Sequence, residues 1–128
     1  VGYAEGVSGS VGGDLIFGSA VANTIDGGLG DDLIIGGAGA DTLTGGQGSD
    51  IFIMQSSDFA ASATVDTITD LQVGDIVMLG GMTQVSLVDN GKSSVLFADV
   101  NGQTHAIVEL LGITGMTLDD LYQQGLLA

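Results

Sequence analysis

The chain has 128 residues, of which 45% are apolar and 23 are Gly, and it contains neither Pro nor Cys. This composition excludes a collagen-like repeat, which needs abundant Pro, and it excludes disulfide or thiolate chemistry, which needs Cys. Sixteen acidic residues face a single base, Lys92, so the net charge is −15 and no basic patch exists for nucleic acid or an anionic membrane surface.

The acidic residues are nearly all of one kind, because fourteen are Asp and only two are Glu. Asp favours tight turns and short-reach oxygen ligation, whereas either acid would serve solubility. Self-repulsion of this size opposes a compact fold unless a partner neutralises it, so the composition predicts a hard cation as partner. No apolar run is long enough to span a membrane, and no classical signal peptide is visible.

Residues 9–53 divide into five nonapeptides without insertion: GSVGGDLIF, GSAVANTID, GGLGDDLII, GGAGADTLT and GGQGSDIFI. The sixth position is Asp or Asn in every unit, namely Asp14, Asn23, Asp32, Asp41 and Asp50. The eighth position is always a large apolar residue, namely Ile16, Ile25, Ile34, Leu43 and Phe52. A looser register upstream, with Glu5 at position six and Val7 at position eight, predicts that the chain begins inside the array.

Each nonapeptide separates into a six-residue turn and a three-residue strand whose central side chain points inward. One unit reverses the chain, so two units complete a coil and residues i and i+18 lie above each other. This geometry predicts parallel strands, with Ile16, Ile34 and Phe52 stacked in one sheet and Ile25 and Leu43 in the other. Such a thin apolar ladder is too small to hold a repulsive shell together unaided.

Three tandem units, residues 27–53, match the pattern GGxGxDxUx in full, and the array thereby resembles the RTX (repeats-in-toxin) calcium-binding family. The resemblance implies an all-β fold, a right-handed parallel β-roll whose turns bind Ca²⁺, about three to four ions in this chain. A flexible Gly-rich linker is the alternative, but linkers do not keep large apolar residues in a nine-residue phase.

The same resemblance implies that each Ca²⁺ lies between a turn and the turn two units later, held by carbonyls and position-six carboxylates. The first implied site comprises Ser10, Gly12 and Asp14 with Gly27, Leu29 and Asp32. The second comprises Ser19, Val21 and Asn23 with Gly36, Ala38 and Asp41. The third comprises Gly28, Gly30 and Asp32 with Gly45, Gln47 and Asp50. A fourth combines Gly37, Gly39 and Asp41 with Asp58 or Asp66 from the segment after the array.

The unit of residues 18–26 departs from the pattern, because it lacks the second and fourth glycines and offers the neutral Asn23. We therefore expect the second site to bind weakly or to stay empty. Asp31, at position five, and Asp26, at an outward strand position, are interpreted as solvated residues rather than ligands.

After Ile53 the nine-residue phase is expected to end, and residues 54–128 are expected to cap the roll of residues 1–53 within one structural unit. Residues 65–79 resemble the segment that follows the array in serralysin-type RTX proteins, with Asp66, Asp70 and Asp75 at matching positions. We interpret Asp70 and Asp75 as turn and edge residues rather than ligands. Alternating apolar and polar residues predict an antiparallel meander of three strands, at residues 83–88, 94–100 and 104–110. Its turns are expected at Asn90-Gly91 and Asn101-Gly102.

The terminal sequence TLDDLYQQGLLA predicts a short helix, with Thr117 and Asp120 as a capping box and Gly125 as its end. Leu118, Leu121 and Tyr122 are expected to share one face. The segment also resembles the uncleaved C-terminal secretion signals of RTX proteins, and a helix that simply docks on the cap is the alternative.

No enzymatic site is expected, because the only histidine, His105, lies in a predicted strand without a nucleophile elbow, and zinc would need further His or Cys ligands. The sequence favours a calcium-binding module that folds outside a bacterial cell and supports type I secretion and folding of a larger secreted protein. An adhesin, surface-layer or polysaccharide-binding module is the alternative, although Trp is absent and Tyr occurs only twice, which leaves little for stacking on sugars.

Overall fold

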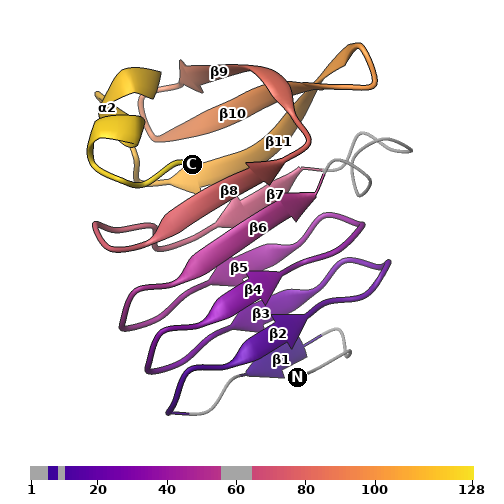
Figure 1. The fold of residues 1–128 in the computed structure, drawn as a ribbon, viewed down its shortest axis with the longest axis vertical. Helices are drawn as coiled ribbons and strands as arrows, with labels where there is room; N and C mark the ends of the chain where they lie inside the picture. Colours follow the sequence, from indigo (N-terminus) through magenta and orange to yellow (C-terminus); the bar gives the residue numbers. More distant parts are fainter. Residues whose placement is uncertain (1–5, 9–10, 56–64) are drawn as a thin grey trace.

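Short strands separated by turns make up most of the computed structural model, which describes residues 6–8, 11–55 and 65–128. Eight strands form a roll: β1 (Gly6–Ser8), β2 (Leu15–Phe17), β3 (Thr24–Asp26), β4 (Leu33–Ile35), β5 (Thr42–Thr44), β6 (Ile51–Gln55), β7 (Asp66–Ile68) and β8 (Ile76–Gly80). Three longer strands follow: β9 (Thr83–Asp89), β10 (Ser93–Val100) and β11 (Gln103–Leu111). One sheet has seven strands in the order β1-β3-β5-β7-β11-β10-β9, and the other has four in the order β2-β4-β6-β8 (Figure 1).

The register of the roll confirms the predicted coil of two nonapeptides. All strand pairs within the roll are parallel, and Ile16 pairs with Ile34, which pairs with Phe52. In the other sheet, Ile25 pairs with Leu43. Strand β1 pairs with β3 so that Val7 lies opposite Ile25, which confirms that the repeat register extends upstream of Gly9.

The roll continues past the point where the nine-residue phase was expected to end. Strand β7 pairs with β5, so Ile68 lies opposite Leu43, and β8 pairs with β6, so Val77 lies opposite Phe52. These partners are 25 residues apart instead of 18, because seven additional residues separate the two halves of the array. Strand β6 extends beyond Ile53 to include Met54 and Gln55, and residues 56–64 lie outside the described part.

The inward side chains form a single apolar core that runs from the roll into the cap. The position-eight side chains Ile16, Ile25, Ile34, Leu43 and Phe52 are each 1% exposed or less. They belong to the same cluster as Leu96, Ile107, Leu110 and Leu121 of the C-terminal half. The apolar core is therefore continuous between the roll and the cap, although within the roll it is only one side chain thick in each sheet.

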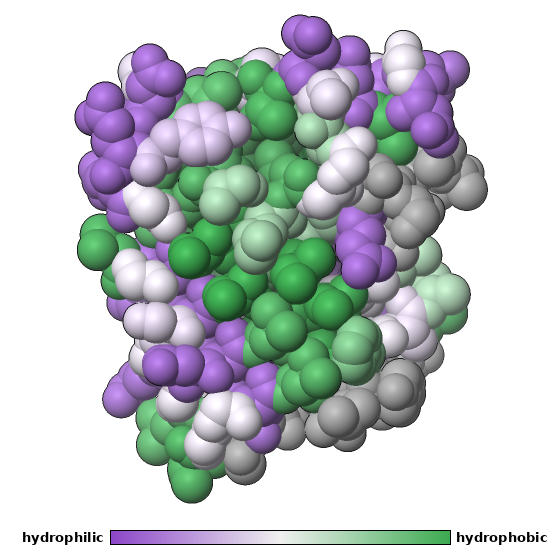
Figure 2. All heavy atoms as spheres, viewed as in Figure 1, coloured by the Kyte–Doolittle hydropathy of each residue, from purple (hydrophilic) through white to green (hydrophobic). Residues whose placement is uncertain are grey.

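The outward side chains differ sharply between the two sheets of the roll. On the four-stranded sheet the two outward positions that β2, β4, β6 and β8 share are all apolar: Leu15, Phe17, Leu33, Ile35, Ile51, Ile53, Ile76 and Met78. At the next outward position the longer strands β6 and β8 carry Gln55 and Gly80. We call this surface the apolar face, and Figure 2 shows it as a continuous green area with purple atoms along its lower left side. On the opposite side, the outward positions of β3 and β5 carry only Thr and Asp. The two sheets therefore present different chemistry to their surroundings.

Strands β9, β10 and β11 form the predicted antiparallel meander. At the turn between β10 and β11, Asn101 and Gly102 have φ angles of 53° and 80°, the left-handed pair that a type I′ hairpin requires. Strand β11 pairs in parallel with β7, so the meander extends the seven-stranded sheet of the roll. The last coil is therefore covered by a continuation of its own sheet, which removes an open strand edge.

The C-terminal helix α2 (Leu118–Gln123) begins with the predicted capping box, in which Thr117 and Asp120 each accept a hydrogen bond from the other's backbone. Of the residues expected to share one face, Leu121 is buried, whereas Tyr122 is 47% exposed. After the helix, Leu127 forms a bridge to Val77, and Ala128 donates its N–H to the Val77 carbonyl at 2.9 Å. The chain end thus covers the edge of β8. No helix among the described residues is long and apolar enough to cross a membrane.

The thin core gives a direct prediction about stability. Leu43→Ala removes a fully buried side chain from the centre of the ladder and is expected to lower the free energy of unfolding by about 2–5 kcal/mol. Thr42→Ala, at the adjacent outward and exposed position, is expected to change it by about 0.5 kcal/mol or less. Urea unfolding of both variants under stabilising conditions measures the difference, and equal losses would contradict the ladder as the stabilising core.

Candidate metal sites

The position-six residues form two rows, one at each edge of the roll where a turn leads into a strand. One row, which precedes the strands of the four-stranded sheet, is Asp14, Asp32, Asp50 and Asp75. The other, which precedes the strands of the seven-stranded sheet, is Asn23, Asp41 and Asp66. All of them except Asp14 are exposed by 2% or less. Charged side chains are seldom buried to this degree unless a partner compensates them.

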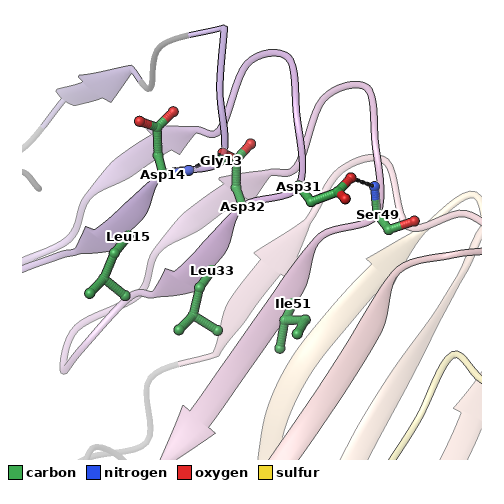
Figure 3. Close-up of a pocket in the computed structure, with 8 residues that line it drawn as sticks. All are labelled: Gly13, Asp14, Leu15, Asp31, Asp32, Leu33, Ser49 and Ile51. Carbon is green, nitrogen blue, oxygen red and sulfur yellow. Dashed lines mark hydrogen bonds between the residues drawn. The ribbon is translucent and has the colours of Figure 1, made fainter.

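One oxygen of each buried carboxylate is engaged by the preceding coil. The backbone N–H of Asp14 donates to Asp32 Oδ1 at 2.8 Å (Figure 3). In the same way, the backbone N–H of Asp32 donates to Asp50 Oδ1 at 3.0 Å. The same bond joins Asn23 to Asp41, Asp41 to Asp66 and Asp50 to Asp75, at 2.8 to 2.9 Å. Each carboxylate therefore closes the turn one coil earlier, and this chain of bonds, which we call the carboxylate ladder, holds the turns in stacked register.

The second oxygen of these carboxylates, Oδ2, has a different environment. Within the described residues, Oδ2 of Asp32 and Oδ2 of Asp50 are buried and have no hydrogen-bond partner. A buried carboxylate oxygen without a partner is costly, which makes these atoms the clearest indication that something is meant to bind there. Each lies against the position-one glycine of its own unit, so that a Cβ on Gly27 would lie 2.5 Å from Asp32 Oδ2. Glycine at position one leaves the space beside this oxygen open.

Burial also shifts the protonation of these acids. Desolvation raises the pKa of Asp50 to about 7, and the nearby charges of Asp75 and Asp32 act in the same direction. Desolvation likewise raises the pKa of Asp32 and of Asp75 above the usual value. Hydrogen bonds from backbone N–H groups oppose the shift but do not cancel it. The environment of the ladder is therefore unfavourable for negative charge unless a cation is nearby.

The backbone brings carbonyl groups of successive coils close together. Gly28 and Gly30 adopt φ angles of 84° and 97°, which L-residues with a side chain rarely adopt. A Cβ at Gly30 would lie 2.8 Å from the carbonyl oxygen of Gly12, and one at Gly37 would lie 2.7 Å from that of Ser19. The carbonyl oxygens of Gly12 and Ser19, both expected as ligands, thus lie beside a glycine of the following coil, where a side chain has no room.

This donor set suits a hard cation. Among the described residues, no three side chains of His, Cys, Asp or Glu gather in one place, so a metal here would take part of its ligands from the backbone. Ca²⁺ accepts six to eight oxygen ligands and mixes carboxylates with backbone carbonyls, whereas Zn²⁺ prefers His and Cys. Paired Asp side chains and convergent carbonyls therefore fit Ca²⁺. The residues that would hold it are those of the carboxylate ladder together with the turn glycines.

Asn23 occupies its place in the ladder in a different way. Its side-chain Nδ2 donates to the Val21 carbonyl at 2.6 Å and to Asp41 Oδ1 at 3.1 Å, and it lies 3.5 Å from the Ser19 carbonyl. These three groups are members of the second predicted site. The side-chain amide of Asn23 thus donates to oxygen atoms of the second predicted site. At the equivalent position of their units, Asp32 and Asp50 have a carboxylate oxygen, which cannot donate. The second site has an internal partner that the neighbouring turns lack.

The remaining predicted ligands divide into three groups. Ser10 and Asp58 lie outside the described residues. Asp66 is joined to Asp41 through the ladder, as the fourth site requires. The side chains of Leu29 and Gln47 are exposed, so only their backbone can contribute, and the Gln47 N–H donates to the Gly28 carbonyl at 3.1 Å. That carbonyl keeps a second lone pair for another partner.

Several acids have structural roles that the sequence interpretation missed. Asp75, interpreted as a turn or edge residue, belongs to the ladder: its Oδ1 accepts from Asp50 and its Oδ2 from the Gln72 N–H at 3.2 Å. Asp70 accepts from the N–H groups of Gly45 and Gly46 and so caps that turn. Asp31, interpreted as only solvated, accepts from the Ser49 N–H at 2.7 Å.

A signal for Asp75 was present in the sequence. Asp66 and Asp75 are nine residues apart, as are successive position-six residues in the array. Ile68 and Val77 have the same separation, as successive position-eight residues do. The seven-residue offset after Ile53 hid this second block of the repeat.

Comparisons with known proteins agree with this geometry. The family model described as the RTX calcium-binding nonapeptide repeat (4 copies) matches residues 8–43 and 17–52. The solution structure of a subunit of the mannuronan C5-epimerase from Azotobacter vinelandii is similar over 94% of this chain and 79% of that one, with 28% identity and a TM-score of 0.65. The crystal structure of an extracellular lipase from Serratia marcescens aligns with 94% of this chain and 20% of the lipase, at 18% identity and a TM-score of 0.43. No curated protein sequence gives a significant match.

The raised pKa values predict how the metal-free chain responds to pH. Since Asp50 has a pKa of about 7 in the folded state and an ordinary value of 3.8, the folded state retains its proton more strongly than the unfolded state. The stabilisation is therefore complete below about pH 4 and is lost as pH rises through about 7. Far-ultraviolet circular dichroism in EDTA should show more folded chain at about pH 5 than at about pH 8.

The variant Asp50→Asn is the control, because an amide at this position does not titrate. Its folded fraction in EDTA should depend less on pH over the same range. A wild-type chain that loses structure toward pH 5, or a variant with an unchanged pH dependence, would contradict the assignment of the shift to Asp50.

Proposed function

Given that this chain carries the calcium-binding nonapeptide repeats of the RTX family, we propose that it is a folding module whose roll forms when Ca²⁺ enters the turns. The observation that carries the proposal is the pair of buried Oδ2 atoms, on Asp32 and Asp50, that have no partner among the described residues. A divalent ion beside each atom would supply the missing partner and remove the cost of burying the charge.

The geometry supports three ions. We assign one to the layer between the turns of Asp14 and Asp32, one to the layer between those of Asp32 and Asp50, and one to the layer between those of Asp41 and Asp66. The layer between the turns of Asn23 and Asp41 takes no ion, because the Asn23 side-chain amide already donates to the Val21 carbonyl and to Asp41 Oδ1. The layer of Asp50 and Asp75 is less suited than the others, because Asp75 uses both of its oxygens for backbone N–H groups.

Binding of this kind has a large effect on a small domain. An ion present at 100 times its dissociation constant adds about 2.7 kcal/mol to the stability of the form that binds it. Three ions would add roughly 8 kcal/mol, which is comparable to the whole free energy of unfolding of an ordinary domain. They would also offset part of the net charge of −15. The chain is therefore expected to be largely unfolded where calcium is scarce and folded where it is plentiful.

We place this module in a larger secreted protein, in the extracellular space or at the surface of a bacterial cell. A chain that stays unfolded at the low calcium of the cytosol and folds outside suits export through a type I secretion apparatus. The C-terminal helix and the tail that docks on β8 are our candidate for the secretion signal, which would be recognised before the tail folds. The module has no enzymatic role in this proposal, and catalysis would belong to another domain of the parent protein.

A polysaccharide-binding or adhesive role is the second candidate, favoured by the similarity to a subunit of a mannuronan C5-epimerase. The charge of this chain argues against direct contact with an anionic sugar polymer, because it has one Lys and no Arg to bind the carboxylates. We therefore regard calcium-dependent folding as the better-supported function.

Removal of calcium tests the proposal directly. The far-ultraviolet circular dichroism spectrum should show β structure in millimolar Ca²⁺ and should lose most of it after addition of EDTA at neutral pH. Mg²⁺ at the same concentration should not replace Ca²⁺, because it demands six ligands in rigid octahedral geometry and dehydrates reluctantly. A roll that stays intact in EDTA at neutral pH would show that the turns do not need an ion.

The assignment of Asn23 gives a separate prediction. Asn23→Asp replaces the amide with a carboxylate among carbonyls that already converge, so calorimetric titration should find one additional Ca²⁺ per chain. The control Thr24→Asp adds the same charge at the next, exposed position and should leave the number of ions unchanged. If wild type and Asn23→Asp bind the same number of ions, the amide does not take the place of a cation.

A further inference from the structure

The proposed function leaves the apolar face unexplained. Its eight side chains lie in two rows across four strands, one through Leu15, Leu33, Ile51 and Ile76 and one through Phe17, Ile35, Ile53 and Met78. Leu15 and Met78 are each 41% exposed, and the six between them are partly exposed. The roll does not require apolar residues at these positions, since the same positions on the other sheet carry Thr24, Thr42 and Thr67. A continuous apolar surface of this kind usually marks an interface.

An acidic wall runs along one side of the face. An open groove of about 380 Å³ lies between the row formed by Leu15, Leu33 and Ile51 and the turns that carry Asp14, Asp31 and Asp32. In Figure 3 the three apolar side chains lie side by side and point the same way, next to these turns. Asp31 remains exposed there and is not among the carboxylates that we assign to an ion. The groove thus combines an apolar wall with an acidic wall that keeps charge when calcium is bound.

The charge of the chain limits what can cover this face. A second copy would bring its own acidic wall and a net charge of −15, with only Lys92 as a base, and Lys92 lies in the hairpin between β9 and β10. Like charges at an interface suppress association. A lipid surface is also disfavoured, because the chain has no Arg and no Trp, and none of the described residues that border the face is Lys.

We infer that the apolar face is a docking surface for another protein whose contact surface has an apolar centre and a border of Lys or Arg. The apolar centre would cover the two rows of Leu, Ile, Phe and Met side chains. The basic border would lie along the groove and pair with Asp31. This arrangement follows the usual anatomy of interfaces, with desolvated apolar contacts at the centre and complementary charges at the rim.

A pair of synthetic amphipathic helices tests this inference in millimolar Ca²⁺ and at physiological salt, where the roll is folded. Both have the same leucine face, one bordered by lysines and one by glutamates. Calorimetric titration should find saturable 1:1 binding of the lysine-bordered helix and none of the other. The variant Ile35→Thr with Ile53→Thr keeps the charge of the chain and should weaken binding by at least about tenfold. The control Thr24→Ser with Thr42→Ser, on the other sheet, should bind like wild type.

Circular dichroism verifies that each variant folds, and Leu15→Thr with Met78→Thr, at the two most exposed positions, replaces the first variant if that one does not. Equal binding by wild type and the Thr variants would show attraction by charge alone and overturn the inference. Equal binding of the two helices would overturn it as well. A wild-type dimer in sedimentation that the Thr variant loses, or adsorption of wild type to phosphatidylcholine vesicles, would assign the face to a second copy or to lipid and would also overturn it.

Discussion

The structure depends on one repeated interaction, the bond from a backbone N–H of one coil to a buried carboxylate of the next. This bond fixes the stacking of the turns. It also requires the burial of five Asp side chains, each of which is 2% exposed or less. The core between the sheets is too thin to offset that burial by itself. In each of Asp32 and Asp50, one carboxylate oxygen accepts a hydrogen bond and the other has no partner among the described residues. The interaction that stacks the turns therefore also creates the buried oxygens beside which we propose that Ca²⁺ binds.

Much of the architecture could be predicted from the period of the sequence. The nine-residue phase of Asp and large apolar residues determines the coil, and Ile16, Ile34 and Phe52 pair as expected. Local signals also sufficed for the Asn101-Gly102 hairpin and the capping box at Thr117. Strands β7 and β8 were not predicted as part of the roll, because seven additional residues interrupt the nine-residue phase. The strands nevertheless pair with β5 and β6. Residues one coil apart are neighbours whatever the length of the chain between them.

The candidate sites could be predicted only in part, for a related reason. Residue types at fixed positions indicate which groups converge, but not which acceptors are already satisfied. Asn23 lacks charge in the sequence, and only the structure shows that its amide reaches the Val21 carbonyl and Asp41. Likewise, the sequence interpretation of Asp70 and Asp75 as turn and edge residues did not include the backbone N–H groups that their oxygens accept from. Such bonds depend on distances across coils, which no local pattern encodes.

The carboxylate ladder is also directional. Every bond of the ladder runs from an earlier N–H to a later side chain, so the carboxylate that closes a turn always comes from a residue nearer the C-terminus. Asp66 and Asp75 are the last members of the two rows, and they lie beside the strands that join the roll to its cap. We therefore expect the coils beside the cap to open last when the roll unfolds, because their closing carboxylates lie on or beside the strands that join the roll to the cap.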